Sequence, residues 1–266
     1  MKLLFLGAGK MATALATAVV KSNLVPVADI LAADPNETAR TAFSAATGVS
    51  CAPDAAPYAS TADVLLVAVK PQVAPQALQA LPSLKPSALV ISICAGIPIA
   101  KISDWTHTRR VIRVMPNTPL MVGEGASCFA PGPDATAEDI AFAQSLLGNA
   151  GIARQVAEEQ LDAVTALSGS GPAYIFEMAK ALALAGEAVG LSESLSLDLA
   201  IQTILGSAKM LHQRIGSPDE LRDAVTSPNG TTYAALQSMK AAEFRTIMRD
   251  AVIAARDRSI ELGKNQ

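Results

Sequence analysis

The sequence predicts an α/β protein in which a doubly wound sheet comes first and an all-helical part follows. Short apolar runs alternate with helical stretches as far as about residue 156. These runs are nearly continuous in apolar residues, which is typical of strands buried on both faces of a parallel sheet. From residue 157 the strand signals vanish and helical periodicity continues to the end. We therefore expect two domains, 1–156 and 157–266.

The expected elements follow one another in a simple order. Strand-like runs are LLFLG, DILAAD, DVLLVAV, ALVISICAG and RRVIRVMP, with further candidates at 126–130 and 152–156. Between and around them, helices are expected at 11–20, 37–46, 73–81, 99–105 and 137–147. The later helices are expected at 158–168, 172–190, 193–214, 218–225, 233–241 and 244–262. Several of these helices carry small apolar residues on almost all of their faces, which indicates burial against other helices and a dimer interface.

A glycine turn joins the first strand to the first helix. Gly7, Gly9 and Ala12 have the G-x-G-x-x-G/A spacing of a dinucleotide-binding βαβ unit. Gly7 permits a tight turn, Gly9 lets the backbone approach a pyrophosphate, and Ala12 allows the helix to pack on the strand. Asp34 ends the second strand, 22 positions after Ala12 (34 − 12), where a spacing of roughly 20 is expected. An ordinary turn is the simpler alternative, but strand, glycines, helix and acid together favour a Rossmann domain.

Composition excludes several other classes of protein. The 266 residues carry a net charge of −3 without a basic patch, so nucleic acid is not an expected partner. The apolar run at residues 3–6 is too short for a secretory signal, and no run is long enough to cross a membrane. The three cysteines are scattered, which suits a reducing cytoplasm and provides no metal-binding spacing.

Small or polar residues close three of the predicted strands, at the edge where open α/β sheets bind ligands. Lys70, followed by Pro71, can face a phosphate, a ribose or a carboxylate, or it can lie in solvent. Ala95 and Gly96 can approach a flat ring or form a plain turn. The amide of Asn117 can bind a carboxamide or a loop carbonyl, or it can stabilise a turn.

The loop at 226–232, TSPNGTT, is rich in hydroxyl groups and precedes an expected helix. Hydroxyls and free N–H groups at a helix N-terminus suit a carboxylate, whereas simple N-capping by one threonine needs only one hydroxyl. The histidines, His107 and His212, have no neighbouring carboxylate to orient them. An alcohol dehydrogenase needs a base, but reduction of a protonated imine does not. A site poor in histidine therefore favours imine reduction.

Several motifs together resemble the pyrroline-5-carboxylate reductase family. They are LGAGKMA at the start, VAVKP at 67–71, RVMPNTP at 113–119, SGSGPAY at 168–174 and LRDAVTSPNGTT at 221–232. The resemblance implies hydride transfer from NADPH or NADH to the cyclic imine 1-pyrroline-5-carboxylate, giving L-proline. It also implies a Rossmann domain followed by a helical dimerisation domain, in homodimers that can assemble into larger rings such as a decamer.

The same resemblance assigns roles to particular residues. The pyrophosphate would be held by Gly7, Gly9, Lys10, Met11 and Ala12. The nicotinamide and its ribose would be lined by Ala68, Lys70, Pro71, Ala95, Gly96, Met115 and Asn117. The substrate carboxylate would be held by Ser227, Gly230, Thr231 and Thr232, in a loop shaped by Val225 and Pro228. Thr232 would be the catalytic residue, hydrogen-bonded to the ring nitrogen.

One position departs from the family pattern. Asp34 stands where many members carry Ser, Thr or Asn-Arg. An aspartate can bind the ribose 2′-OH of NAD and would repel the 2′-phosphate of NADP, unless Arg40 in the next helix compensates. The preference between NADH and NADPH is therefore open.

Two other functions are compatible with this architecture. A β-hydroxyacid dehydrogenase shares it, but that family places a catalytic lysine four residues after its last glycine, where this chain has Ile175. Lys180 lies nine positions after Gly171 (180 − 171) and would point elsewhere. A nucleotide-binding regulator without turnover would use the helices as a partner surface. The hydroxyl-rich loop argues against it, because a sensor needs no second anion site.

Overall fold

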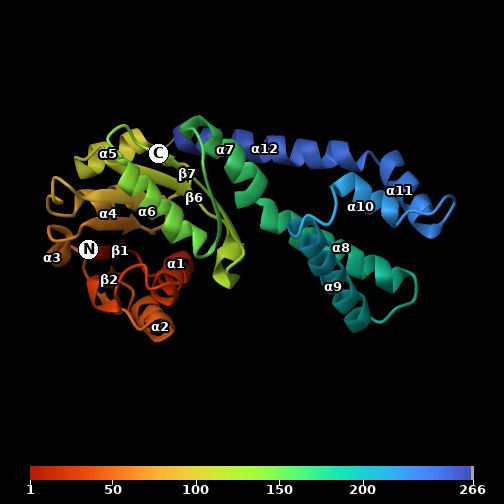
Figure 1. Cartoon of the computed structure of the whole chain (residues 1–266), viewed down its shortest axis with the longest axis horizontal. Helices are drawn as coiled ribbons and strands as arrows, with labels where there is room; N and C mark the ends of the chain where they lie inside the picture. Colours follow the sequence, from red (N-terminus) through yellow and green to blue (C-terminus); the bar gives the residue numbers. More distant parts are fainter. Residues whose placement is uncertain (265–266) are drawn as a thin grey trace. The chain divides into compact units, whose positions relative to one another are not determined.

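The computed structural model describes residues 1–264 and divides them into two compact units, with the elements labelled in Figure 1. The first unit comprises Met1–Ser170 together with the chain from Ala254 onward, and the second comprises Gly171–Ile253. The boundary predicted between 156 and 157 stays a prediction. No helix in the described part is both long and apolar enough to cross a membrane.

The first unit is built on one sheet with the strand order β3-β2-β1-β4-β5-β6-β7-β8. Neighbours from β3 to β6 pair in parallel, with Leu4 opposite Leu31 on one side and Leu65 on the other. This confirms the predicted doubly wound α/β fold. The strands are β1 Leu3–Leu6, β2 Ile30–Ala33, β3 Ser50–Ala52, β4 Val64–Val67, β5 Leu89–Ser92, β6 Val111–Met115, β7 Gly125–Pro131 and β8 Gly151–Gln155.

Helices cover both faces of this sheet because successive side chains of a strand point to opposite sides. Leu3 and Phe5 pack in one apolar cluster with Phe43 of α2, whereas Leu4 and Leu6 belong to a second cluster. The first cluster also includes side chains of α1 and α6, and the second includes side chains of α4 and α5. The helices are α1 Lys10–Lys21, α2 Glu37–Thr47, α3 Ala56–Ala59, α4 Ala74–Gln79, α5 Ile99–Thr106 and α6 Ala137–Gly148.

Some elements differ from those expected. Strand β3 and helix α3 were not expected, because three or four residues are too few to show a periodic pattern. Strand β7 runs antiparallel to β6, a direction that an apolar run does not reveal. The single helix expected at 158–168 is broken into a 3₁₀ turn at Glu158–Gln160, α7 Leu161–Val164 and a π-helical turn at Thr165–Gly169. In that turn the N–H of Ser170 donates to the carbonyl of Thr165, five residues back.

The second unit consists of helices and leaves much apolar surface exposed. The side chains of Phe176 and Val189 are 68% and 81% exposed, although the sequence predicts burial of these helices. Helices α8 and α9 approach closely, since a Cβ on Gly186 would lie 2.6 Å from Oγ of Ser196. The helices are α8 Gly171–Ala188, α9 Glu193–His212, α10 Pro218–Ala224, α11 Thr231–Ala241 and α12 Phe244–Lys264, whose last part returns to the first unit.

Candidate active site

The glycine turn has the backbone geometry that a bound dinucleotide requires. Gly7 has a φ of +105°, and a Cβ there would lie 2.8 Å from the carbonyl oxygen of Ala68. A Cβ on Gly9 would meet nothing within 4 Å, so space is open beside this backbone. Gly9 is also the N-cap of α1 and makes no side-chain capping bond, which leaves the helix N-terminus available to an anion. The turn therefore fits a pyrophosphate.

The helix after the turn combines packing with exposure. Ala12 is fully buried against the sheet, which is the close approach that its small side chain allows. Met11 is half-buried against the same core, and Lys10 is exposed. Gly9 and Lys10 also line a cavity of about 810 Å³ that continues between α1 and α2. Lys10 is thus placed to meet a negative group at the turn.

Asp34 binds the glycine turn itself. Its Oδ2 accepts the backbone N–H of Ala8 at 2.9 Å, and its Oδ1 accepts that of Asn36 at 2.8 Å. Nη1 of Arg40 donates to the backbone carbonyls of Asp34 and Pro35 at 3.0 and 2.8 Å. The carboxylate therefore fastens the turn to the end of β2. The roles of Asp34 at the ribose and of Arg40 at a 2′-phosphate stay predictions.

The ends of β4 and β5 are joined by a buried thiol. Sγ of Cys94 donates to the carbonyl of Val69 at 3.3 Å, and burial raises the pKa of this thiol to about 11. Cys94 therefore stays protonated and acts as a small buried residue, as its apolar surroundings indicated. Beyond it, Gly96 is buried with a φ of +77°, which favours glycine. At the neighbouring strand end Lys70 is exposed and Pro71 is half-buried.

Asn117 uses both groups of its amide within the protein. Its Nδ2 donates to the carbonyl of Ser168 at 3.1 Å, and its Oδ1 accepts the N–H of Ala126 at 2.8 Å. Of the alternatives that the sequence left open, the loop carbonyl is the partner found. The side chain of Met115 fills the space beside Gly169, where a Cβ would collide with its methyl group. The segment after β6 thus holds the π-helical turn in place.

Sequence reasoning missed Glu158. Its Oε1 accepts the N–H of Ile99, at the start of α5, at 2.7 Å. The same atom accepts a hydrogen bond from Nη1 of Arg113 at 3.2 Å. Arg113 lies in β6 and is only 7% exposed. The available signal was an arginine inside an apolar strand run, because a buried guanidinium needs an anionic partner.

The hydroxyl-rich loop leads into α11 without a hydroxyl cap. Helix α11 begins at Thr231, and its N-cap is Gly230, which makes no side-chain capping bond. The simpler alternative of N-capping by a threonine is therefore wrong. Ser227 and Thr231 are exposed and Thr232 is half-buried, so hydroxyls surround a helix N-terminus whose N–H groups suit a carboxylate. A Cβ on Gly230 would collide with Oγ of Ser227.

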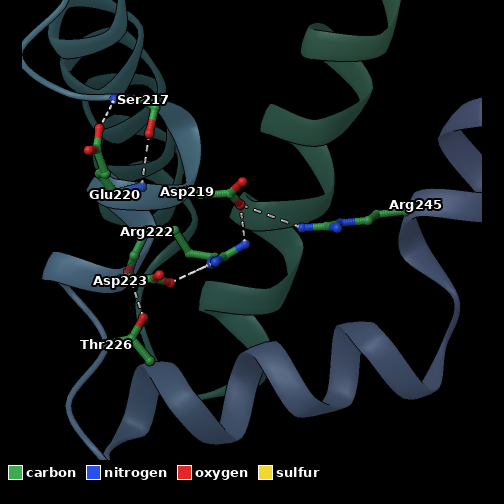
Figure 2. A network of polar contacts seen from close by, with 7 residues as sticks. All are labelled: Ser217, Asp219, Glu220, Arg222, Asp223, Thr226 and Arg245. Carbon is green, nitrogen blue, oxygen red and sulfur yellow. Dashed lines mark hydrogen bonds and ion pairs between the residues drawn. The ribbon is translucent and has the colours of Figure 1, made fainter.

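A network of polar contacts holds the start of this loop, as Figure 2 shows. Arg222 of α10 pairs with Asp219 at 2.6 Å and with Asp223 at 2.7 Å. Thr226 donates its hydroxyl to the carbonyl of Arg222 at 2.6 Å. Arg245 also reaches Asp219, at 3.9 Å. This network ties the first residue of the loop to the end of α10.

The predicted site residues fall into two sets. The glycine turn, Asp34 and the residues that follow β4, β5 and β6 lie in the first unit, at the carboxyl edge of the sheet. Residues 225–232 lie in the second unit, at the N-terminus of α11. Within residues 1–264, no group of three or more His, Cys, Asp or Glu side chains is placed to hold a metal ion.

A doubly wound sheet with this glycine turn, followed by helices with a hydroxyl-rich loop at a helix N-terminus, is typical of the class of nicotinamide-dependent oxidoreductases. Two family descriptions match the chain. "NADP oxidoreductase coenzyme F420-dependent" matches residues 2–96, and "Pyrroline-5-carboxylate reductase dimerisation" matches residues 158–262.

Full-length relatives narrow the class to one family. The pyrroline-5-carboxylate reductase of Arabidopsis thaliana is 42% identical over 98% of this chain and 95% of its own length. That of Methanosarcina acetivorans is 42% identical over 99% of this chain and 98% of its own length. The crystal structure of Plasmodium falciparum pyrroline carboxylate reductase with NADP bound has a TM-score of 0.85 and 31% identity, covering 99% and 98% of the two chains. The chain belongs to the pyrroline-5-carboxylate reductase family, as its motifs predicted.

Proposed function

We propose that this protein reduces 1-pyrroline-5-carboxylate to L-proline with NADPH or NADH, the last step of proline biosynthesis. The observation that carries the proposal is the likeness to enzymes of this name over 98–99% of the chain. That likeness includes both the glycine turn and the hydroxyl-rich loop, and neither of them alone specifies both a cofactor and a substrate.

The first unit would bind the cofactor, which supplies a hydride to the C=N bond when it is bound in reduced form. Gly7 and Gly9 shape the turn for the pyrophosphate, and Ala12 brings the N-terminus of α1 close to it. Lys10 adds a positive charge, and Met11 supports the turn from the core side. The residues proposed to line the nicotinamide and its ribose are Ala68, Lys70, Pro71, Ala95, Gly96, Met115 and Asn117.

The loop before α11 would bind the substrate. Its carboxylate would lie at the helix N-terminus, where the N–H groups, the hydroxyls of Ser227 and Thr231, and the backbone of Gly230 stabilise an anion. Thr232 would form a hydrogen bond through Oγ1 to the ring nitrogen. These residues mainly position the imine, because an iminium already carries the charge that makes it electrophilic.

The assembly would be a homodimer formed through the helical domain, with larger rings such as a decamer built from dimers. The match of residues 158–262 to a dimerisation domain and the exposed apolar side chains of the second unit support this proposal. The chain would divide into a cofactor-binding domain at 1–156 and a helical dimerisation domain at 157–266. A cytoplasmic location is supported by the three cysteines, all of which are free.

One assay tests the activity directly. NADH and NADPH oxidation should be followed side by side at 340 nm with 1-pyrroline-5-carboxylate, and the product analysed for L-proline. We expect NAD(P)H oxidation that depends on the imine, and no reduction of NAD⁺ or NADP⁺ when 3-hydroxy acids are supplied with the oxidised cofactors. Turnover of a 3-hydroxy acid would favour a β-hydroxyacid dehydrogenase, and cofactor binding without any turnover would favour a regulator.

A further inference from the structure

A single carboxylate oxygen joins two segments that the proposed cofactor site needs. Oε1 of Glu158 accepts both the N–H of Ile99 and a guanidinium N–H of Arg113. Ile99 comes three residues after Gly96, and Arg113 comes two residues before Met115. Gly96 and Met115 are both proposed to contact the nicotinamide end of the cofactor. The oxygen therefore links the start of α5 to β6, close in sequence to both proposed contact residues.

The surroundings of this oxygen restrict how far each segment can move. Ile99 and Arg113 are 6% and 7% exposed, so both partners of Glu158 lie within the packed interior. Gly96 is buried with a positive φ. A Cβ on Gly263 of α12 would lie 3.1 Å from the carbonyl oxygen of Gly96. The loop between β5 and α5 is thus hydrogen-bonded to Glu158 at its far end and packs closely against α12 at Gly96.

We propose that Glu158 is a positioning residue that sets the geometry of the nicotinamide end of the cofactor site. It acts through the N–H of Ile99 on the loop carrying Ala95 and Gly96, and through Arg113 on the strand that ends at Met115. A purely structural ion pair would stabilise the whole unit equally. A positioning role instead affects the nicotinamide end and leaves the glycine turn, at the other end of the cofactor, unchanged.

The experiment compares two ligands in the full-length protein, and it rests on the proposed cofactor site but not on the imine. NADH binding is measured by fluorescence and ADP-ribose binding by calorimetry, because ADP-ribose keeps the pyrophosphate and lacks the nicotinamide. Glu158→Ala removes both hydrogen bonds, whereas Glu158→Gln keeps an acceptor oxygen. Glu159→Ala is the matched control, since Glu159 is an exposed neighbour in the same turn.

We expect Glu158→Ala to weaken NADH binding about tenfold, because only part of the effect of losing both hydrogen bonds reaches the nicotinamide end, while ADP-ribose binding changes less than about twofold. Glu158→Gln should restore most of the affinity for NADH, and Glu159→Ala should bind both ligands as the wild type does. Equal weakening of NADH binding and ADP-ribose binding, or no change in NADH binding, would overturn the proposal.

A second variant covers the case in which Glu158→Ala does not fold. Glu158→Asp keeps the charge but is one methylene too short to reach both partners. It should weaken NADH binding severalfold and spare ADP-ribose, and the same two contrary outcomes would overturn the proposal. If the wild type fails to reduce the imine, the proposed activity is wrong, while the two binding ratios still decide the role of Glu158.

Discussion

Replacing each glycine of the turn separately by alanine should separate stability from cofactor binding. At Gly7 the left-handed backbone costs a residue with a Cβ about 1–2 kcal/mol. The new Cβ would also lie 2.8 Å from the oxygen and 2.9 Å from the carbon of the Ala68 carbonyl. That backbone cannot move away freely, since the N–H of Ala68 donates a hydrogen bond to the carbonyl of Leu6 in β1 at 2.8 Å. Overpacking of this kind adds about 1–3 kcal/mol.

We therefore expect Gly7→Ala to lower the free energy of unfolding by about 3 kcal/mol, the sum of these two effects. Gly9→Ala is the matched comparison, because its φ is −73° and its Cβ meets no atom within 4 Å. Its stability should change by less than about 0.5 kcal/mol. The added methyl group would occupy space proposed for the pyrophosphate, so NADH affinity should fall at least about tenfold.

Urea unfolding and NADH fluorescence titration, performed on both variants, measure the two effects independently. A Gly7→Ala protein as stable as the wild type would refute the expected clash, because it would mean that the backbone at Ala68 can move away. A Gly9→Ala protein that binds NADH normally would refute the expected loss of affinity, because the open space beside Gly9 would then not be the pyrophosphate site.

Three further predictions concern other parts of the site and its support. Thr232→Ala should lower kcat/KM for the imine by about tenfold, the effect of one lost hydrogen bond, and an unchanged kcat/KM would exclude that role. Asp34→Ser should weaken NADH and NADPH binding together, because it frees the N–H of Ala8; a gain for NADPH alone would show that repulsion dominates. Burial raises the pKa of Asp139, but hydrogen bonds from Arg110 at 2.5 and 2.7 Å and from the N–H of Thr136 outweigh this and lower it. A lowered pKa stabilises the fold above the unfolded carboxyl's pKa of about 4 and ceases to do so as the pH falls through the folded value. Arg110→Ala should therefore cost roughly 2 kcal/mol at pH 7, and the difference in unfolding free energy should shrink below about pH 4; a difference independent of pH would contradict this.

The fold could be predicted largely because its signals are local. The apolar runs at Leu3–Leu6 and Val64–Val67 are long enough to mark strands, and the spacing of Gly7 and Gly9 marks the turn between β1 and α1. The three-residue strand β3 and the direction of β7 have no such signal. Their pairing depends on partners distant in sequence, so periodicity alone could not reveal them.

The site was less predictable because its polar groups find partners far along the chain. Asn117 was expected at the cofactor, yet both its hydrogen bonds join backbone groups of residues 126 and 168. Asp34 has the expected spacing, but its carboxylate also fastens the turn that it was expected to serve. Glu158 showed no motif at all, since its importance comes from Ile99 and Arg113, 59 and 45 residues away. Residue type shows which bonds are possible, whereas only the fold decides which partner is within reach.

In the helical unit, burial of apolar side chains depends in a similar way on a distant partner, which here would be a second chain. Its sequence is apolar on almost every helix face, which predicts burial, yet side chains such as Leu184 and Ile201 are 54% and 51% exposed in the single chain. Their exposure would leave a larger apolar surface than monomeric proteins normally tolerate. Since residues 158–262 match a dimerisation domain, the predicted burial and the observed exposure are compatible if a second copy covers these helices. The core that the sequence predicts for this half is then a property of the proposed dimer, and it should be lost with the dimer on dilution.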